Sequence, residues 1–71
     1  MENGKVKFII LKYFKYEHLP LHLQQTSKKF CELANDLAET LPTGQESIAE
    51  VSTALRKLLE AKDAAVRAQL G

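Results

Sequence analysis

The residues best suited to bind a ligand lie together near the start of the chain. In one short segment, three aromatic residues are interleaved with two lysines, and a histidine closes the segment: Lys12, Tyr13, Phe14, Lys15, Tyr16 and His18. Aromatic rings stack on flat bases, and lysine ammonium groups donate charge-assisted hydrogen bonds to phosphates. This aromatic-basic cluster therefore predicts a site for a ligand with planar rings and phosphates, contacted by Tyr13, Tyr16 and His18.

Further candidate cations lie later in the chain, at Lys28, Lys29, Arg56 and Arg67. Each arginine has an acidic residue four positions away, which is the spacing of a surface ion pair on a helix. Such pairs contribute little to stability. A ligand contact and a solvated helix face both remain open for these four residues.

Catalytic chemistry finds no support in the sequence. There is no Gly-rich phosphate loop and no nucleophile motif, and Cys31 adjoins the apolar Phe30, which is typical of a structural thiol. His18 and His22 are four residues apart, but no second group of metal ligands accompanies them. We therefore expect a protein that is not an enzyme and that has no cofactor and no metal.

The charge balance limits the partners. The 71-residue chain has ten basic and nine acidic residues, a formal net charge of +1, which argues against DNA or RNA as a general partner. No apolar segment is long enough to cross a membrane. The single cysteine favours a reducing cytoplasm.

The longest predicted element is one amphipathic helix from Thr43 to Leu70. Thr43 and Glu46 have the spacing of a capping box, which predicts the start of the helix. At about 1.5 Å per residue the helix would be about 40 Å long. Its apolar stripe comprises Ile48, Val51, Leu55, Leu58, Leu59, Val66 and Leu70.

A second helix is predicted from about Leu21 to Leu41, directly after Pro20. The tight connection Leu41–Gly44 then turns the chain back, so the two helices form an antiparallel hairpin. The buried side of this second helix is predicted to comprise Leu23, Phe30, Leu33, Ala34, Leu37, Ala38 and Leu41.

Residues 1–19 are interpreted as an N-terminal arm and residues 20–71 as the helical hairpin of a single all-α domain. Met1–Lys5 is polar and expected to be mobile. The apolar segment Val6–Tyr16 has the composition of a strand but no partner strand, so extended chain, a short helix and pairing with another subunit all remain open.

Self-association is expected by elimination. A chain of this size buries little surface and is usually stabilised by disulfides, a metal or oligomerisation, and the first two are not supported. A two-helix hairpin also leaves apolar surface outside. The row of Ala54, Ala61, Ala64, Ala65 and Ala68 suits a subunit contact or reflects helix propensity alone, at even odds.

Several short motifs, in this order and spacing, resemble a family of small bacteriophage proteins. The motifs are Phe14-Lys15-Tyr16, His18-Leu19-Pro20, Ser27-Lys28, Phe30-Cys31-Glu32-Leu33-Ala34, Ala54-Leu55-Arg56-Lys57-Leu58 and Glu60-Ala61-Lys62-Asp63. The family is that of the anti-CBASS cyclic-oligonucleotide sponges, which share their helical hairpin with sponges directed at Thoeris signals. The resemblance covers residues 13–68 and does not include the apolar leader, Val6–Leu11.

The resemblance implies a non-enzymatic oligomer, typically a hexamer, that acts in the host cytoplasm. Family members trap cyclic dinucleotides, and some trap cyclic trinucleotides, so that the immune effector is not activated. By resemblance, Tyr16 would stack on a base, with Tyr13 as the alternative. Lys28, or its neighbour Lys29, would hold a phosphate, and Arg67 would contact larger ligands.

Two other functions are kept as alternatives. The first is a helical-hairpin interaction module without a nucleotide ligand, in which Tyr16 and Pro20 serve packing only. The second is a small DNA- or RNA-binding regulator, against which the balanced charge counts.

Overall fold

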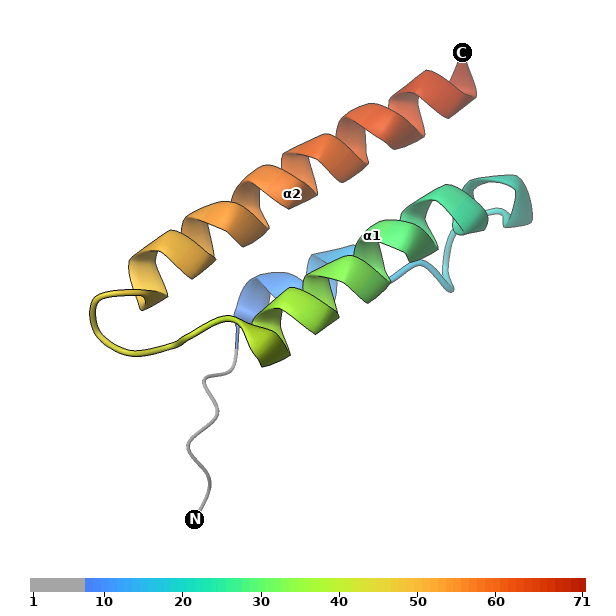
Figure 1. The fold of residues 1–71 in the computed structure, drawn as a ribbon. Coiled ribbons are helices and arrows are strands. Elements are labelled where there is room, and N and C mark those ends of the chain that lie inside the picture. Colours follow the sequence, from blue (N-terminus) through green and yellow to red (C-terminus); the bar gives the residue numbers. More distant parts are fainter. Residues whose placement is uncertain (1–7) are drawn as a thin grey trace.

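A computed structural model describes residues 8–71 (Figure 1). This part of the chain contains the 3-10 helix η1 (Ile9–Phe14) and the α-helices α1 (Leu21–Thr40) and α2 (Ile48–Leu70), and no strand. The predicted mobile segment Met1–Lys5 and the first two residues of the apolar leader lie outside the described residues.

The two long helices run antiparallel and pack against each other, and η1 packs against both of them (Figure 1). A side-chain hydrogen bond from Thr26 on α1 to Gln69 on α2 joins the two helices near the C-terminal end of α2. The predicted all-helical hairpin is therefore confirmed. The molecule is elongated, with principal extents of 42 × 22 × 16 Å.

The boundaries of α1 follow from the two prolines of the chain. Pro20 lies at the N-cap, where its carbonyl accepts the amide of Leu23 at 2.9 Å. At the other end Leu41 is extended, with φ −77° and ψ 148°, because the residue before Pro42 is disfavoured in helical conformation. The predicted helix is confirmed to within one residue.

The predicted start of α2 is wrong. The helix begins at Ile48 rather than near Thr43, and the N-cap residue Ser47 makes no side-chain capping hydrogen bond. The amides of Ser47 and Ile48 both donate to the carbonyl of Gly44, each at 2.9 Å. These two bonds make a turn that leads into the helix, and the predicted capping box of Thr43 and Glu46 does not form at its start.

Four buried residues form the core where the three helices meet: Phe14, Ala34, Val51 and Leu55. Phe14, Ala34 and Leu55 are completely buried, and half-buried apolar side chains surround them. This core is small, as expected for a chain of this length.

Two residues of the predicted apolar stripes are exposed instead. Leu33 on α1 retains 45% of its exposure and Leu70 on α2 retains 66%. Leu33 lies at the margin of its stripe, next to the fully buried Ala34 but roughly 100° away around the helix. Gln69 faces α1, where it contacts Thr26. Leu70 is the next residue, so its side chain points roughly 100° away from that direction.

The apolar leader, for which three conformations were open, forms the short helix η1 over Ile9–Phe14. The amide of Leu11 donates to the carbonyl of Phe8 at 3.1 Å, which is the hydrogen-bond pattern of a 3-10 helix. With three residues per turn, Leu11 and Phe14 lie on the same side, and that side faces the hairpin.

Candidate functional site

Most of the predicted binding residues lie at one end of the hairpin. Tyr16 and His18 are in the linker between η1 and α1, Lys28 and Lys29 are in the first half of α1, and Arg67 is in the last turn of α2. Because the helices are antiparallel, the end of α2 lies beside the first half of α1 (Figure 1). Three separate segments thus contribute polar side chains to this end.

The linker that carries Tyr16 is held by a set of hydrogen bonds. The amide of Leu19 donates to the carbonyl of Tyr16 at 3.0 Å, which closes a turn. The side-chain amide of Gln24, on α1, donates to the carbonyls of Leu19 at 2.8 Å and Glu17 at 3.4 Å. The half-buried Tyr16 is therefore carried by a backbone that α1 itself fixes.

The aromatic-basic cluster is divided between the core and the surface. Phe14 is completely buried and belongs to the core, so it does not share the surface with the other side chains of the cluster. Tyr13 is 56% exposed, and the ammonium of Lys12 lies 5.1 Å from the centre of its ring, a cation–π contact. His18 is exposed.

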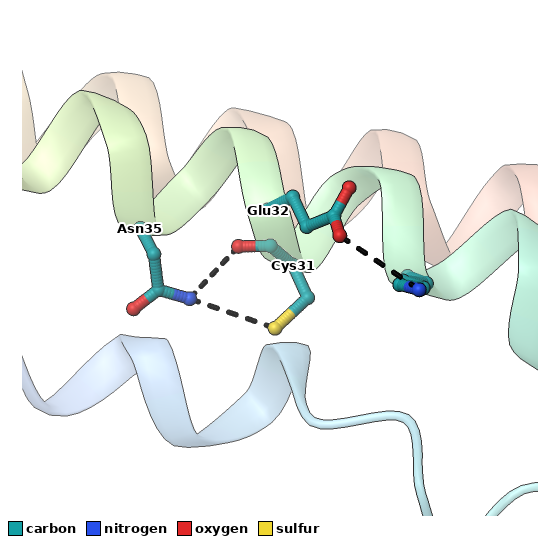
Figure 2. A network of polar contacts seen from close by, with 4 residues as sticks. Cys31, Glu32 and Asn35 are labelled. Atoms are coloured by element: carbon teal, nitrogen blue, oxygen red, sulfur yellow. Dashed lines mark hydrogen bonds and ion pairs between the residues drawn. The ribbon is translucent and has the colours of Figure 1, made fainter.

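Lys28 and Lys29 are both exposed but face different directions, because successive helix residues are roughly 100° apart. The Nζ atom of Lys28 lies 4.0 Å from Oε2 of Glu32, one turn along α1 (Figure 2). Both of these side chains are more than half exposed, so the pair adds little stability. Lys29 makes no ion pair within the described part of the chain. A single ligand site can therefore be contacted by Lys28 or by Lys29 more readily than by both of them.

Neither arginine forms its expected ion pair among residues 8–71. Asp63 pairs instead with its neighbour Lys62, with Nζ and Oδ1 3.0 Å apart. Arg56 lies eleven residues before Arg67, which is roughly 16 Å along α2. The structure therefore does not bring Arg56 to the end of the hairpin where the other candidates lie.

A polar contact within α1, on the side of this helix that faces η1, was not predicted from the sequence. The side-chain amide of Asn35 donates to the carbonyl of Cys31 at 2.8 Å and contacts its Sγ at 3.5 Å, and both side chains lie on the side of α1 that faces η1 (Figure 2). Burial raises the pKa of the Cys31 thiol, and the charges of Glu17 and Glu32 raise it further, while the contact with Asn35 lowers it. The thiol is therefore protonated at neutral pH, as fits a structural cysteine.

The burial of Ser27 is the second feature that was not predicted from the sequence. Its side chain is completely buried, and its hydroxyl has no hydrogen-bond partner among residues 8–71. The spacing of the buried residues indicates this position, because Ser27 lies four residues after the buried Leu23 and seven before the buried Ala34, on the same side of the helix. Its small size, rather than its hydroxyl, suits this position.

Within the described residues, no three histidine, cysteine or acidic side chains are grouped so that they could hold a metal ion. The helices of that part are also too short or too polar to pass through a bilayer. The arrangement instead offers an aromatic ring, a histidine and several cations around one end of the hairpin.

Comparison of the chain with models of protein families, with curated proteins and with solved structures gave no match. The resemblance to the cyclic-oligonucleotide sponges therefore remains a prediction from the sequence.

Proposed function

We propose that this protein binds and sequesters cyclic oligonucleotides without transforming them. The observation that carries the proposal is Tyr16, a half-buried tyrosine on a linker that hydrogen bonds hold against α1. A ring that is carried by a fixed backbone loses less freedom when a base stacks on it, which favours tight binding. The resemblance described above assigns the same role to Tyr16.

The cations at the same end of the hairpin support an anionic ligand. Lys28, or alternatively Lys29, would contact one phosphate, His18 would border the ring, and Arg67 would reach a larger ligand. A few converging cations can attract a small dianion even though the net charge of the whole chain is only +1. The same near-neutral charge disfavours polymeric DNA and RNA.

A cyclic dinucleotide has approximate twofold symmetry, with two bases and two phosphates. Two subunits related by a twofold axis would present Tyr16 and its lysine twice, which matches that symmetry. We therefore include a homo-oligomer, of the hexameric kind that the resemblance implies, in the proposal. Its role would be to lower the free concentration of the messenger in the host cytoplasm, so that CBASS effectors stay inactive.

The test is native mass spectrometry of the full chain with a panel of cyclic di- and trinucleotides and cyclic ADP-ribose isomers. We expect an oligomer that gains a whole number of cyclic nucleotides and releases them unchanged after heat denaturation. Tyr16→Ala should abolish this uptake and leave the oligomer intact, whereas Tyr13→Ala serves as the matched control with a weaker effect. An oligomer that binds no member of the panel would contradict the proposal.

A second candidate function, a helical module for protein interaction, is favoured by the exposed apolar side chains. Large hydrophobic residues with high exposure are Ile9, Tyr13, Leu21, Leu33 and Leu70. Exposed apolar groups of this size are typical of interaction surfaces when they cluster. For this alternative, Tyr16→Ala would break the assembly, whereas the sponge keeps its assembly and loses the ligand.

A further inference from the structure

One exposed face of α1 has a charge at each end and an apolar residue between them. The face consists of Lys29, Leu33 and Asp36, of which Leu33 is 45% exposed and the two charged residues are also exposed. Cys31 and Asn35 lie on the side of α1 toward η1 (Figure 2). Leu33 is two residues from each of them, or roughly 200° around the helix, so this face is turned away from η1.

The two charges on this face are left without an oppositely charged partner by the described residues. Neither Lys29 nor Asp36 makes an ion pair with any other residue of the described chain, in contrast to Lys28, which lies near Glu32. Lys29 and Asp36 are seven residues apart, close to two full turns, so both project from the same side about 10 Å apart. Along the axis of α1 the face therefore reads positive, apolar, negative.

We infer that this face is the contact between two copies of the chain, with the two α1 helices packed antiparallel about a twofold axis through Leu33. When Leu33 faces the partner's Leu33, Lys29 lies opposite position 37 of the other subunit. The partner's Asp36 is one residue from that position, or about 1.5 Å along the axis. The twofold axis repeats the pair, so two ion pairs flank one apolar centre.

The arrangement of charges on this face favours a second copy of the chain as the partner and an antiparallel orientation of the two α1 helices. A parallel arrangement would bring Lys29 against the partner's Lys29 and Asp36 against the partner's Asp36, and both contacts are repulsive. Only the antiparallel arrangement joins opposite charges at both ends. A face that is complementary to itself under a twofold rotation is what an isologous dimer requires.

This inference names one subunit contact of the proposed oligomer, different from the contact that would present Tyr16 twice to a ligand, and it rests on that proposal for the existence of an oligomer. It does not depend on the ligand, because the contact involves no residue of the Tyr16 linker. Its experiment is therefore run on nucleotide-free protein. In that state the alternative role of Lys29 as a phosphate contact does not enter the measurement.

The experiment is sedimentation equilibrium of the full chain and of the variants Lys29→Glu, Asp36→Lys and the double variant Lys29→Glu/Asp36→Lys. Each single variant turns two attractions into two repulsions, so we expect its association to weaken at least about tenfold. The double variant exchanges the charges but keeps them complementary, so it should recover association to within about threefold of the original.

The matched control is Lys57→Glu on α2. Lys57 is exposed and has a glutamate three residues later, as Lys29 does, so it undergoes the same change of charge in a similar local setting. It should leave the association unchanged. A second measurement uses the unaltered chain, whose association should weaken between low and high salt because exposed ion pairs are screened.

The possible failures are distinguishable. An oligomer that is indifferent to Lys29→Glu, or a double variant that fails to recover, would overturn the inference and leave nucleotide binding untouched. Recovery in the double variant, together with no nucleotide uptake by the unaltered chain, would support the inference and overturn the proposed ligand. A chain that stays monomeric at millimolar concentration would overturn both.

Discussion

The hydroxyl of Thr26 on α1 donates a hydrogen bond to the side-chain oxygen of Gln69 on α2, across 43 residues of sequence. This contact joins the first half of α1 to the last turn of α2. The candidate residues on the linker and on the two helices share one end of the molecule because the hairpin is aligned in this way.

Replacing Thr26 with valine should loosen the last turn of α2. The contact is exposed, so the loss in the free energy of unfolding should be below about 1 kcal/mol. Amide hydrogen exchange around Gln69 should nevertheless accelerate. The matched control is Thr53→Val, because the Thr53 hydroxyl donates to the carbonyl of Ala49 within its own helix, at 3.0 Å, and joins no second helix. Equal acceleration around Gln69 in both variants would contradict the prediction.

Ser27→Ala should stabilise the protein. The hydroxyl of Ser27 is buried without a partner in the described part of the chain, and such a group costs roughly 1–3 kcal/mol. Alanine is also the better helix former. We expect the free energy of unfolding in urea to rise by about 1 kcal/mol. Ser52→Ala, at a half-buried position on α2, is the control and reports the helix propensity alone. A decrease on replacing Ser27 would show that its hydroxyl is hydrogen-bonded in solution.

Phe14→Ala should remove most of the stability that η1 provides. Truncating a fully buried phenylalanine typically costs 3–5 kcal/mol, whereas a domain of this size has only about 4–11 kcal/mol in total. Thermal unfolding followed by circular dichroism should show a large drop in Tm. Tyr13→Ala, at the neighbouring exposed position, should change the Tm little. Similar losses for both variants would contradict the assignment of Phe14 to the core.

Cys31 should make stability fall at alkaline pH. Burial raises the pKa of its thiol, so the unfolded chain releases this proton at a lower pH than the folded chain does. The stabilising contribution is complete below the unfolded pKa of about 8.5 and is lost as the pH rises through the folded pKa. The free energy of unfolding in urea should decrease between pH 7 and pH 10. In the Cys31→Ala variant this decrease should be smaller. Identical pH profiles would contradict the prediction.

The hairpin was predictable because strong local signals determine it. Pro20 and Pro42 bracket α1, and helical spacing of apolar residues identifies both long helices. These signals act through backbone sterics and through burial, which hold wherever the helices pack. The start of α2 was not predictable in this way, because the amides of Ser47 and Ile48 bond to the carbonyl of Gly44 in a turn, and residue spacing alone does not reveal that turn.

The candidate site was predictable only in part, because residue type does not say which ring is buried. Phe14 and Tyr13 are adjacent and both aromatic, yet Phe14 is in the core and Tyr13 is exposed. That outcome depends on the 3-10 conformation of η1, which the sequence left open. The exposure of Leu33 likewise depends on where α2 and η1 cover α1, and this follows from tertiary packing rather than from spacing.

The docking of η1 on a hairpin made of neighbouring segments also determines the order of folding. Contacts between α1 and α2 close one short loop, and chains rich in such local contacts fold quickly. A lone 3-10 turn has no comparable nucleus, so Phe14 can enter its place only after the two long helices have met. A conservative change such as Phe14→Leu should therefore speed unfolding and leave the rate of folding nearly unchanged, with a φ-value close to zero.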